Sequence, residues 1–497
     1  MLPIQSSLLF PDCKMIKKIF ASMLFVTFSY AQNNVNEKIE QLELQIKELK
    51  KQTAANTADL NEYIPVIEAS ETQSLLDKLD FLPELEIRMD KMDYKLGKIE
   101  GENTTADYPD GLNQQRRDEF KKDFDPAVAV KFKLNLFGDI NKYTKFNGRF
   151  VFTMSTQSHQ RLCILSRDIK SVSSSSGFDL DRAYIDFTPN IGSDYAFTFS
   201  FGVLPTTGGT PMNFALNTER KSMFPALVFD MDTYGLIGTQ KLGSNNFFRV
   251  IAAKAYTLNP SIYPYQCNRE NIDNANILGA YYDTKFKLFS GESLLSFGVN
   301  YLGDFKAHPY LGPDVNADDA NILGDIFTYG LGLDVRDLLN DKLTFFIHTA
   351  ISNPDANGKI DDYQIVNVAN GTTIRGTIGF SEADYAKGTM LKKDGYSFYV
   401  GMKYNINDNF NFGAEYNQGS KYWFSATQGA EDMYNKLATR GNVSEVYGIY
   451  KFHKDIFAKL GFMYTNEDYT GSGWHFGKPT KKDATQKVSY LSIKAEF

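Results

Sequence analysis

The sequence has little of what catalytic, metal-binding and nucleic-acid-binding proteins normally use. It contains 5 His and 3 Cys in 497 residues. No two His share a metal-ligand spacing, and Cys-x-x-Cys, P-loop and Gly-x-Ser-x-Gly motifs are missing. Its 53 basic residues face 60 acidic ones, without a basic block, so the charge does not suit nucleic acid. We therefore predict no enzyme, no catalytic residue, no metal or other cofactor, and no nucleic-acid partner.

Long apolar runs are also missing. No stretch reaches the roughly 18 consecutive apolar residues of a membrane-spanning helix, which excludes a helical membrane protein. Aromatic residues are nevertheless abundant, with 39 Phe and 29 Tyr against 2 Trp. A transmembrane β-barrel fits both facts, because its apolar residues alternate with polar ones.

The N-terminus predicts export. From Met15 the chain runs through Lys17 and Lys18 into an apolar stretch, 19–28, and then to Ser29-Tyr30-Ala31. This order is typical of a signal peptide cleaved after Ala31, so that 1–31 is a leader with an upstream extension.

Two cysteines remain after the leader is removed, Cys163 and Cys267. An exported protein meets an oxidising compartment, where the two thiols can form a disulfide. The sequence leaves this possible disulfide and two free thiols equally open, because it does not give the distance between the Cα atoms.

A heptad pattern predicts a periplasmic helical or coiled-coil segment over 32–82. The apolar positions, spaced 4, 3, 4 and 3 residues apart, are Val35, Ile39, Leu42, Ile46 and Leu49. Two heptads are too short to be stable alone. An ordinary amphipathic helix explains the pattern nearly as well.

From residue 83 onward the apolar period changes to two, which predicts β-strands. The clearest strand is 195–203, where Tyr195, Phe197, Phe199, Phe201 and Val203 alternate with small or polar residues. A soluble β-sandwich gives the same alternation. Two features favour a barrel: short and long connections alternate along the chain, and the last strand ends on Phe497, an aromatic C-terminal signal for the barrel-insertion machinery.

The strand count predicts an all-β, antiparallel transmembrane β-barrel of about 16 strands over 83–497. About fifteen strands follow Ala127, and a periplasmic N-terminus then requires one strand before them. The candidate is 83–99, with Leu85, Ile87 and Met89 on one face. The sequence of 75–99 also fits a helix. Bacterial single-chain barrels have an even number of strands, which supports 16.

Three segments resemble a known family. They are 178–188, which includes Arg-Ala-Tyr-Ile-Asp-Phe, then 202–211 with its Pro-Thr-Thr-Gly-Gly-Thr-Pro, and 220–230. Together they resemble an uncharacterised domain-of-unknown-function family of exported, porin-like proteins of Gram-negative bacteria, over roughly 70–497. The resemblance implies an outer-membrane barrel and leaves the solute open. The Arg-Ala-Tyr-Ile-Asp-Phe strand is also similar to strands of phosphate-selective porins.

Charged residues between the apolar ones predict the lining of the lumen. If the apolar faces meet lipid, Lys131, Lys133, Arg149 and Arg182 point inward from three successive strands. Strands lie about 4.8 Å apart, so these residues would form a basic patch near Asp186. Internal salt bridges with Asp179, Asp181 or Asp186 are an equally good interpretation.

The segment 205–229 is the predicted constriction loop. Its proline and glycine content favours a fixed, non-helical path. We expect it to fold into the barrel and narrow it, and the alternative is an external surface loop. The residues expected to shape it are Pro205, Gly208, Gly209, Pro211, Glu219, Arg220 and Lys221.

These observations predict an outer-membrane porin for passive diffusion of small hydrophilic solutes, anionic solutes among them. Its partners would be the lipid bilayer, the insertion machinery and further copies of the chain, with a trimer plausible. A structural or scaffold barrel that binds a periplasmic or electron-transfer partner is the alternative.

Overall fold

The computed structural model describes residues 79–98, 119–156, 176–218, 220–255, 275–288, 290–306, 322–357, 361–367, 372–378, 392–427, 432–469, 472, 479 and 481–496. The predicted leader and the predicted helical segment up to residue 78 lie outside these residues. So do Cys163, Cys267, Glu219 and Phe497.

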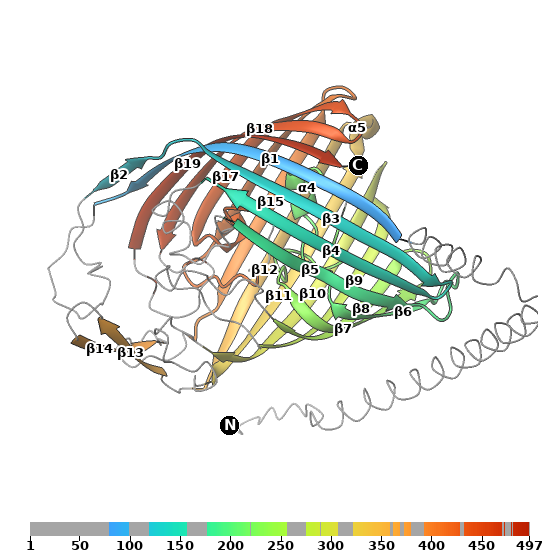
Figure 1. Ribbon diagram of the computed structural model, residues 1–497, viewed down its shortest axis with the longest axis horizontal. Helices are drawn as coiled ribbons and strands as arrows, with labels where there is room; N and C mark the ends of the chain where they lie inside the picture. Colours follow the sequence, from blue (N-terminus) through green and yellow to red (C-terminus); the bar gives the residue numbers. More distant parts are fainter. Residues whose placement is uncertain are drawn as a thin grey trace, which may run out of the picture. The chain divides into compact units, whose positions relative to one another are not determined.

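Sixteen antiparallel strands form one closed ring (Figure 1). The strands are β1 (Leu79–Leu96), β3 (Ala127–Asn141), β4 (Thr144–Ser155), β5 (Ser176–Phe187), β6 (Phe197–Val203), β7 (Thr233–Leu242), β8 (Asn246–Ala255), β9 (Asn276–Leu288), β10 (Gly291–Lys306), β11 (Ile322–Asp337), β12 (Leu343–Ala356), β15 (Gly395–Asn405), β16 (Phe410–Gly419), β17 (Gly441–His453), β18 (Ile456–Tyr469) and β19 (Lys481–Glu496). The first and last strands close the ring, with Glu84 opposite Glu496 and Leu96 opposite Ala484. The predicted 16-stranded barrel is confirmed.

The remaining elements are short. Strand β2 (Phe120–Asp123) pairs with one end of β1, and β13 (Asp361–Asn367) pairs with β14 (Thr372–Ile378) between β12 and β15. The helical turns are α4 (Met212–Leu216), α5 (Leu338–Asp341) and η3 (Lys436–Ala438). Within the described residues, no helix is long and apolar enough to cross a membrane.

The barrel begins earlier than the sequence indicates. Strand β1 starts at Leu79, inside the segment predicted to be helical to 82. Pro83 explains the error, because proline normally ends a strand or lies at its edge. Here Pro83 is opposite Leu134 of β3, and pairing with β19 starts one residue later at Glu84. Pro83 therefore has a strand partner on one side only.

The two faces of the strands differ as expected for a membrane barrel. Large apolar side chains such as Phe132, Phe201 and Phe398 are exposed on the outer face. Polar and charged residues such as Arg149 and Glu415 are buried on the inner face. This alternation brings apolar groups to lipid and polar groups to the lumen.

Aromatic rings lie over glycines of neighbouring strands on part of the inner face. The pairs, each directly opposite in register, are Tyr281 with Gly298, His348 with Gly332, Phe346 with Gly401, Tyr447 with Gly413, and Tyr490 with Gly461. A Cβ on any of these glycines would lie within 2.7 Å of the ring. The missing side chain makes room for the ring, so each pair fixes strand register.

We expect Gly413→Ala to destabilise the barrel, because the new Cβ would lie 2.2 Å from the Tyr447 ring. The expected loss is about 1–3 kcal/mol, as for other overpacked sites. Urea unfolding of the protein in detergent micelles measures it. Ser444→Ala, at an exposed position of β17, is the control. Equal unfolding midpoints for the two variants would contradict the register role of the pair.

Candidate functional site in the barrel lumen

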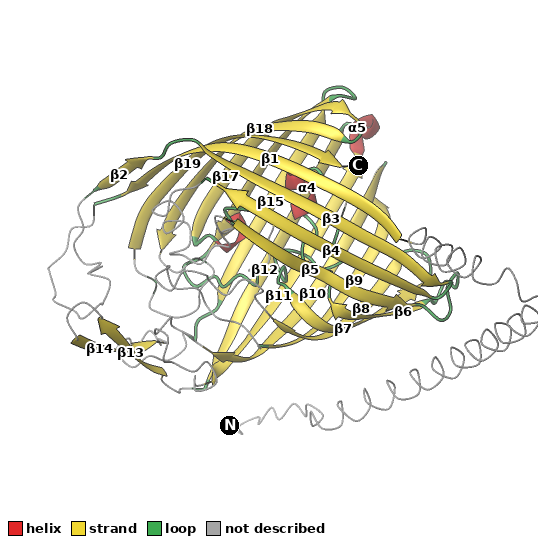
Figure 2. Cartoon of the chain, viewed as in Figure 1, coloured by secondary structure: helices red, strands yellow, loops and turns green. Residues whose placement is uncertain are grey.

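The loop between β6 and β7, residues 204–232, lies inside the ring of strands. Most of its side chains are buried, and Thr206, Ala226 and Phe229 are completely so. Its short helix α4 is visible within the barrel (Figure 2). A loop on the outside of a barrel would be exposed to solvent, so we refer to 204–232 as the inward loop.

The inward loop is bonded to strands on several sides of the lumen. Thr210 Oγ1 donates to Asp334 Oδ2 of β11 at 2.6 Å. Lys403 Nζ of β15 donates to Asn217 Oδ1 at 3.0 Å, and Lys459 Nζ of β18 donates to the Ala215 carbonyl at 2.6 Å. These bonds fix the position of the loop from β11 to β18.

Two adjacent residues of the loop reach nearly opposite walls. Arg220 Nη2 lies 3.1 Å from Asp283 Oδ2 on β9, and Lys221 Nζ lies 2.5 Å from Glu84 Oε1 on β1. Six strands separate β1 from β9 on one side and eight on the other. The four side chains therefore form a charged crossbar that spans the lumen.

A second loop, between β16 and β17, also turns inward. Trp423, Phe424 and Arg440 in this loop have no exposed surface. It touches the inward loop directly, since the Asp230 amide donates to the Ala426 carbonyl at 2.7 Å. The two loops thus form one body inside the barrel.

Buried charges hold the second loop to the wall. Lys436 Nζ donates to Glu445 Oε2 at 2.6 Å and also forms an ion pair with Glu415. Tyr447 Oη donates to Glu415 Oε1 at 2.8 Å. Burial alone would lower the pKa of the Lys436 ammonium, but the two glutamates raise the pKa of Lys436 well above its ordinary value. Lys436 is therefore a cation at neutral pH.

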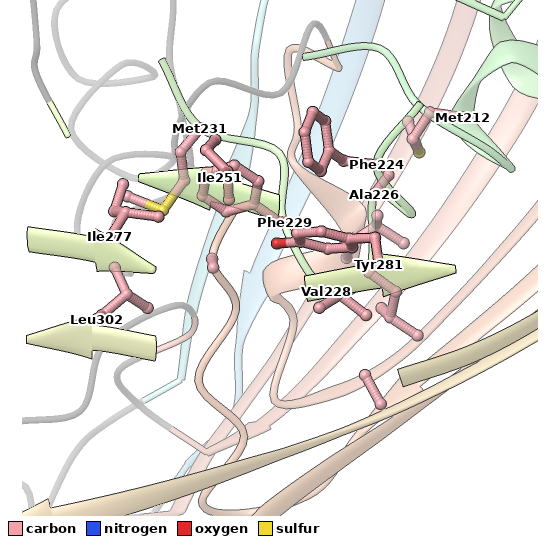
Figure 3. Close-up of a cluster of buried hydrophobic side chains, with 14 of the residues drawn as sticks. Met212, Phe224, Ala226, Val228, Phe229, Met231, Ile251, Ile277, Tyr281 and Leu302 are labelled. Atoms are coloured by element: carbon pink, nitrogen blue, oxygen red, sulfur yellow. The ribbon is translucent and has the colours of Figure 1, made fainter. Parts of the chain in front are cut away.

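An apolar core joins the inward loop to the barrel wall. Figure 3 shows Phe229 and Met231 of the loop beside Ile251, Ile277 and Leu302 of β8, β9 and β10. Each large apolar side chain buried in this way contributes about 1.5–3 kcal/mol. The inner wall here is packed like the core of a soluble protein and leaves no apolar face to water.

The inner faces of the strands differ in their access to water. On β16 the inward side chains are buried throughout, and most are on β10–β12 and β17–β19. We call this side the packed wall. On β3–β6 many inward side chains are partly exposed, among them Lys131, Asn147, Thr153, Tyr184 and Thr198. We call this side the accessible wall. An inward side chain of a closed barrel gains exposure only from the lumen, so water reaches the accessible wall.

The predicted basic residues lie on the inner face of β3–β5. Lys131 is partly exposed, and Lys133 and Arg149 are buried. Arg149 Nε donates to Asp181 Oδ1 at 2.8 Å, so this residue takes part in one of the internal salt bridges considered above. Asp186 accepts from Ser200 Oγ at 2.5 Å and from Asn147 Nδ2 at 3.3 Å. The basic patch and the internal salt bridge therefore coexist.

Arg182 connects the basic patch to the inward loop. Its Nη2 donates to the Thr207 carbonyl at 2.7 Å and its Nη1 donates to the Lys221 carbonyl at 3.1 Å. The guanidinium thus holds the loop at two points that are far apart in its sequence. This places the basic patch beside the crossbar.

Two glycines of the predicted loop are required by its path. Gly208 has a φ of +78°, a backbone conformation that favours glycine. A Cβ on Gly209 would lie 1.7 Å from the Phe224 carbonyl oxygen. Pro205 is partly buried and Pro211 is buried in the same segment. These residues shape the first half of the inward loop.

Sequence reasoning missed the packed wall and the second loop. The signal for apolar packing on the inner face, from β7 to β12, was present as neighbouring apolar residues where a strand should alternate. Examples are Leu236-Ile237, Val250-Ile251, Ile277-Leu278 and Phe345-Phe346. In each pair the outer residue faces the lipid side and the inner one faces the interior packing. The second loop carries one signal, the adjacent aromatic residues Tyr422, Trp423 and Phe424, in a segment whose length is that of an external loop.

The geometry defines a porin-like antiparallel β-barrel with loops folded into its lumen. The chain belongs to the family described as protein of unknown function, DUF3373, whose model matches 121–246 and 280–495. The predicted resemblance to a porin-like family of unknown function is therefore confirmed.

Solved structures of outer-membrane proteins are similar at low identity. OprB of Pseudomonas putida is 11% identical, with 86% of this chain and 97% of that chain covered and a TM-score of 0.45. OmpF of Salmonella typhi, in complex with daunomycin, is 12% identical, with 84% of this chain and 97% of that chain covered and a TM-score of 0.42. An anion-selective porin of Comamonas acidovorans is 8% identical, with 84% of this chain and 100% of that chain covered and a TM-score of 0.41. A comparison with curated proteins found no match.

Lys436→Met should weaken the attachment of the second loop. The substitution leaves Glu415 buried without its ion-pair partner and leaves Glu445 paired with Lys459 alone, which costs about 3–5 kcal/mol. The temperature at which the folded form disappears from unboiled detergent gels should fall. Lys454→Met is the control, because the Lys454 side chain is 81% exposed. An unchanged transition temperature in Lys436→Met would show that the ion pairs do not stabilise the loop.

Proposed function

We propose that this protein is an outer-membrane channel through which small hydrophilic solutes diffuse passively. The observation that carries the proposal is the contrast between the packed wall and the accessible wall. Water beside Lys131, Asn147 and Thr153 supports a polar path along β3–β6, at the edge of the lumen. The apolar outer surface supports the outer membrane as its location.

The crossbar and the inward loop would set the size limit of this path. Arg220 and Lys221 are anchored on opposite walls, and Arg182 ties the loop to β5. Each anchor is a charged group with a bonded partner, so the loop is a fixed constriction and not a mobile gate. Solutes would pass between the loop and the accessible wall without any covalent step.

The charge of Lys131 would draw anions toward the path. Lys131 is partly exposed on the accessible wall, whereas Lys133 and Arg149 are buried. The nearby carboxylates equal the four basic residues in number, with Glu84 and Glu86 opposite the two lysines on β1 and Asp181 and Asp186 on β5. Fixed charges in a narrow polar lumen attract ions of opposite sign. In a salt gradient across a planar bilayer, Lys131→Gln should lower the ratio of anion to cation permeability. An unchanged reversal potential would rule out a role for Lys131 in selectivity.

Further partners follow from the barrel architecture. Folding into the membrane would require the barrel-insertion machinery. A homo-oligomer such as a trimer agrees with the apolar outer face of the strands. Reconstitution into membranes with and without the insertion machinery tests the first proposal. The mass of the native protein in detergent tests the second.

Cysteine labelling locates the path. In a background with Cys163→Ser and Cys267→Ser, Thr153→Cys places a thiol on the accessible wall and Ser296→Cys places one on the packed wall. An anionic methanethiosulfonate reagent should react with Thr153→Cys and reduce its single-channel conductance. Ser296 has no exposed surface, so Ser296→Cys should keep its conductance.

The opposite labelling pattern, or equal reaction at both positions, would contradict a path along β3–β6. A scaffold barrel for a periplasmic or electron-transfer partner predicts a third result. It would insert into bilayers and show no conductance in either variant before labelling.

A further inference from the structure

We propose that Tyr184 is the contact residue of a solute-binding position on the accessible wall, and that it fits a saccharide or a similar polyhydroxylated ring. The proposal rests on the channel function proposed above and names the class of solute. Tyr184 lies on β5, between Arg182 and Asp186 on the same inward face. Alternate residues of a strand lie about 6.8 Å apart, so the ring has a cation on one side and a carboxylate on the other.

The ring of Tyr184 differs from the other aromatic rings that face a glycine. Tyr184 is directly opposite Gly202 of β6. In the five pairs described above, ring atoms come within 2.7 Å of the position of a glycine Cβ. The atoms nearest to that position on Gly202 are backbone atoms of Ala183 and Tyr184. The Tyr184 ring is therefore not among the three closest contacts at Gly202, unlike the rings of the five pairs.

Two further observations keep this ring available to a solute. Tyr184 is partly exposed, whereas Tyr281, Tyr399, Tyr447 and Tyr490 on other strands are buried. Within the part of the chain that the structure describes, the Tyr184 hydroxyl has no hydrogen-bond partner. Glycine at 202 adds no side chain beside the ring. Part of the Tyr184 side chain therefore stays open to a solute.

Asp186 supplies a positioned acceptor next to the ring. Ser200 Oγ donates to its Oδ1 at 2.5 Å and Asn147 Nδ2 donates to its Oδ2 at 3.3 Å. These bonds hold the carboxylate in place. A carboxylate has about four lone-pair sites, so both oxygens can still accept from a solute. The inner face thus combines an aromatic platform with a fixed acceptor of hydroxyl groups.

This combination matches the chemistry of a sugar ring. The C–H face of such a ring packs on an aromatic side chain, and its hydroxyl groups donate to a carboxylate. A small inorganic anion has no apolar face to pack on the ring. Arg182 bonds to the inward loop two residues away, so the position lies next to the constriction, where binding would affect transport most.

Saturation-transfer NMR tests the binding position without requiring conductance. The protein is held in a detergent without sugar head groups, such as an amine oxide, and is given glucose, sucrose or maltotriose. We expect saturation transfer to the ring C–H protons of at least one sugar, and at least a tenfold weaker affinity in Tyr184→Ala. Tyr184→Phe should retain most of the transfer. Tyr234→Ala, at an exposed outward position of β7, is the matched control.

The results separate the two proposals. No transfer from the wild-type protein to any of the three sugars, or equal transfer in Tyr184→Ala, would overturn the binding position even if the barrel conducts. Folding of each variant is checked by its mobility on unboiled gels. Sugar binding by a barrel that shows no conductance would overturn the channel and leave the position in place.

Discussion

The structure depends on the requirement that every backbone N–H and C=O group in an apolar environment has a hydrogen-bond partner. A sheet satisfies this condition only when its first and last strands pair. Here β1 pairs with β19 along 13 successive residues from Glu84 to Leu96. Closure also fixes two environments for side chains, one outside and one inside. The exposed aromatic residues and the buried charges follow from this single geometric fact.

Folded loops occupy part of the barrel interior. The two inward loops fill one side of it with apolar packing and buried ion pairs, and the crossbar from Glu84 to Asp283 passes through the centre. The cost of these buried charges is offset because each cation has a carboxylate or a carbonyl partner. Many inward side chains on β3–β6 stay partly exposed. In the proposed channel, a fixed loop packed against one wall would restrict solutes to the other wall, which connects the packing to the proposed transport.

Much of this architecture could be predicted from the sequence, because alternation records which side of a strand faces lipid. The alternation predicted the number of strands and the inward direction of Lys131 and Arg182. The start of β1 was misjudged because Pro83 looks like a boundary. The partners of Arg182 and Lys221 could not be predicted, since they lie on loops and strands distant in sequence. In the sequence, Tyr184 is only one residue of a strand motif. Its proposed role depends on the space that Gly202 leaves beside it on the neighbouring strand.

The most direct test of the account is the single-channel conductance of the wild-type protein in planar lipid bilayers. A water-filled path beside β3–β6 predicts discrete, stable current steps, because the inward loops are anchored and do not open or close. Protein that keeps the gel mobility of a folded barrel and yet gives no current steps would contradict it. In that case the exposure of Lys131 and Thr153 would reflect an enclosed space and not a route across the membrane.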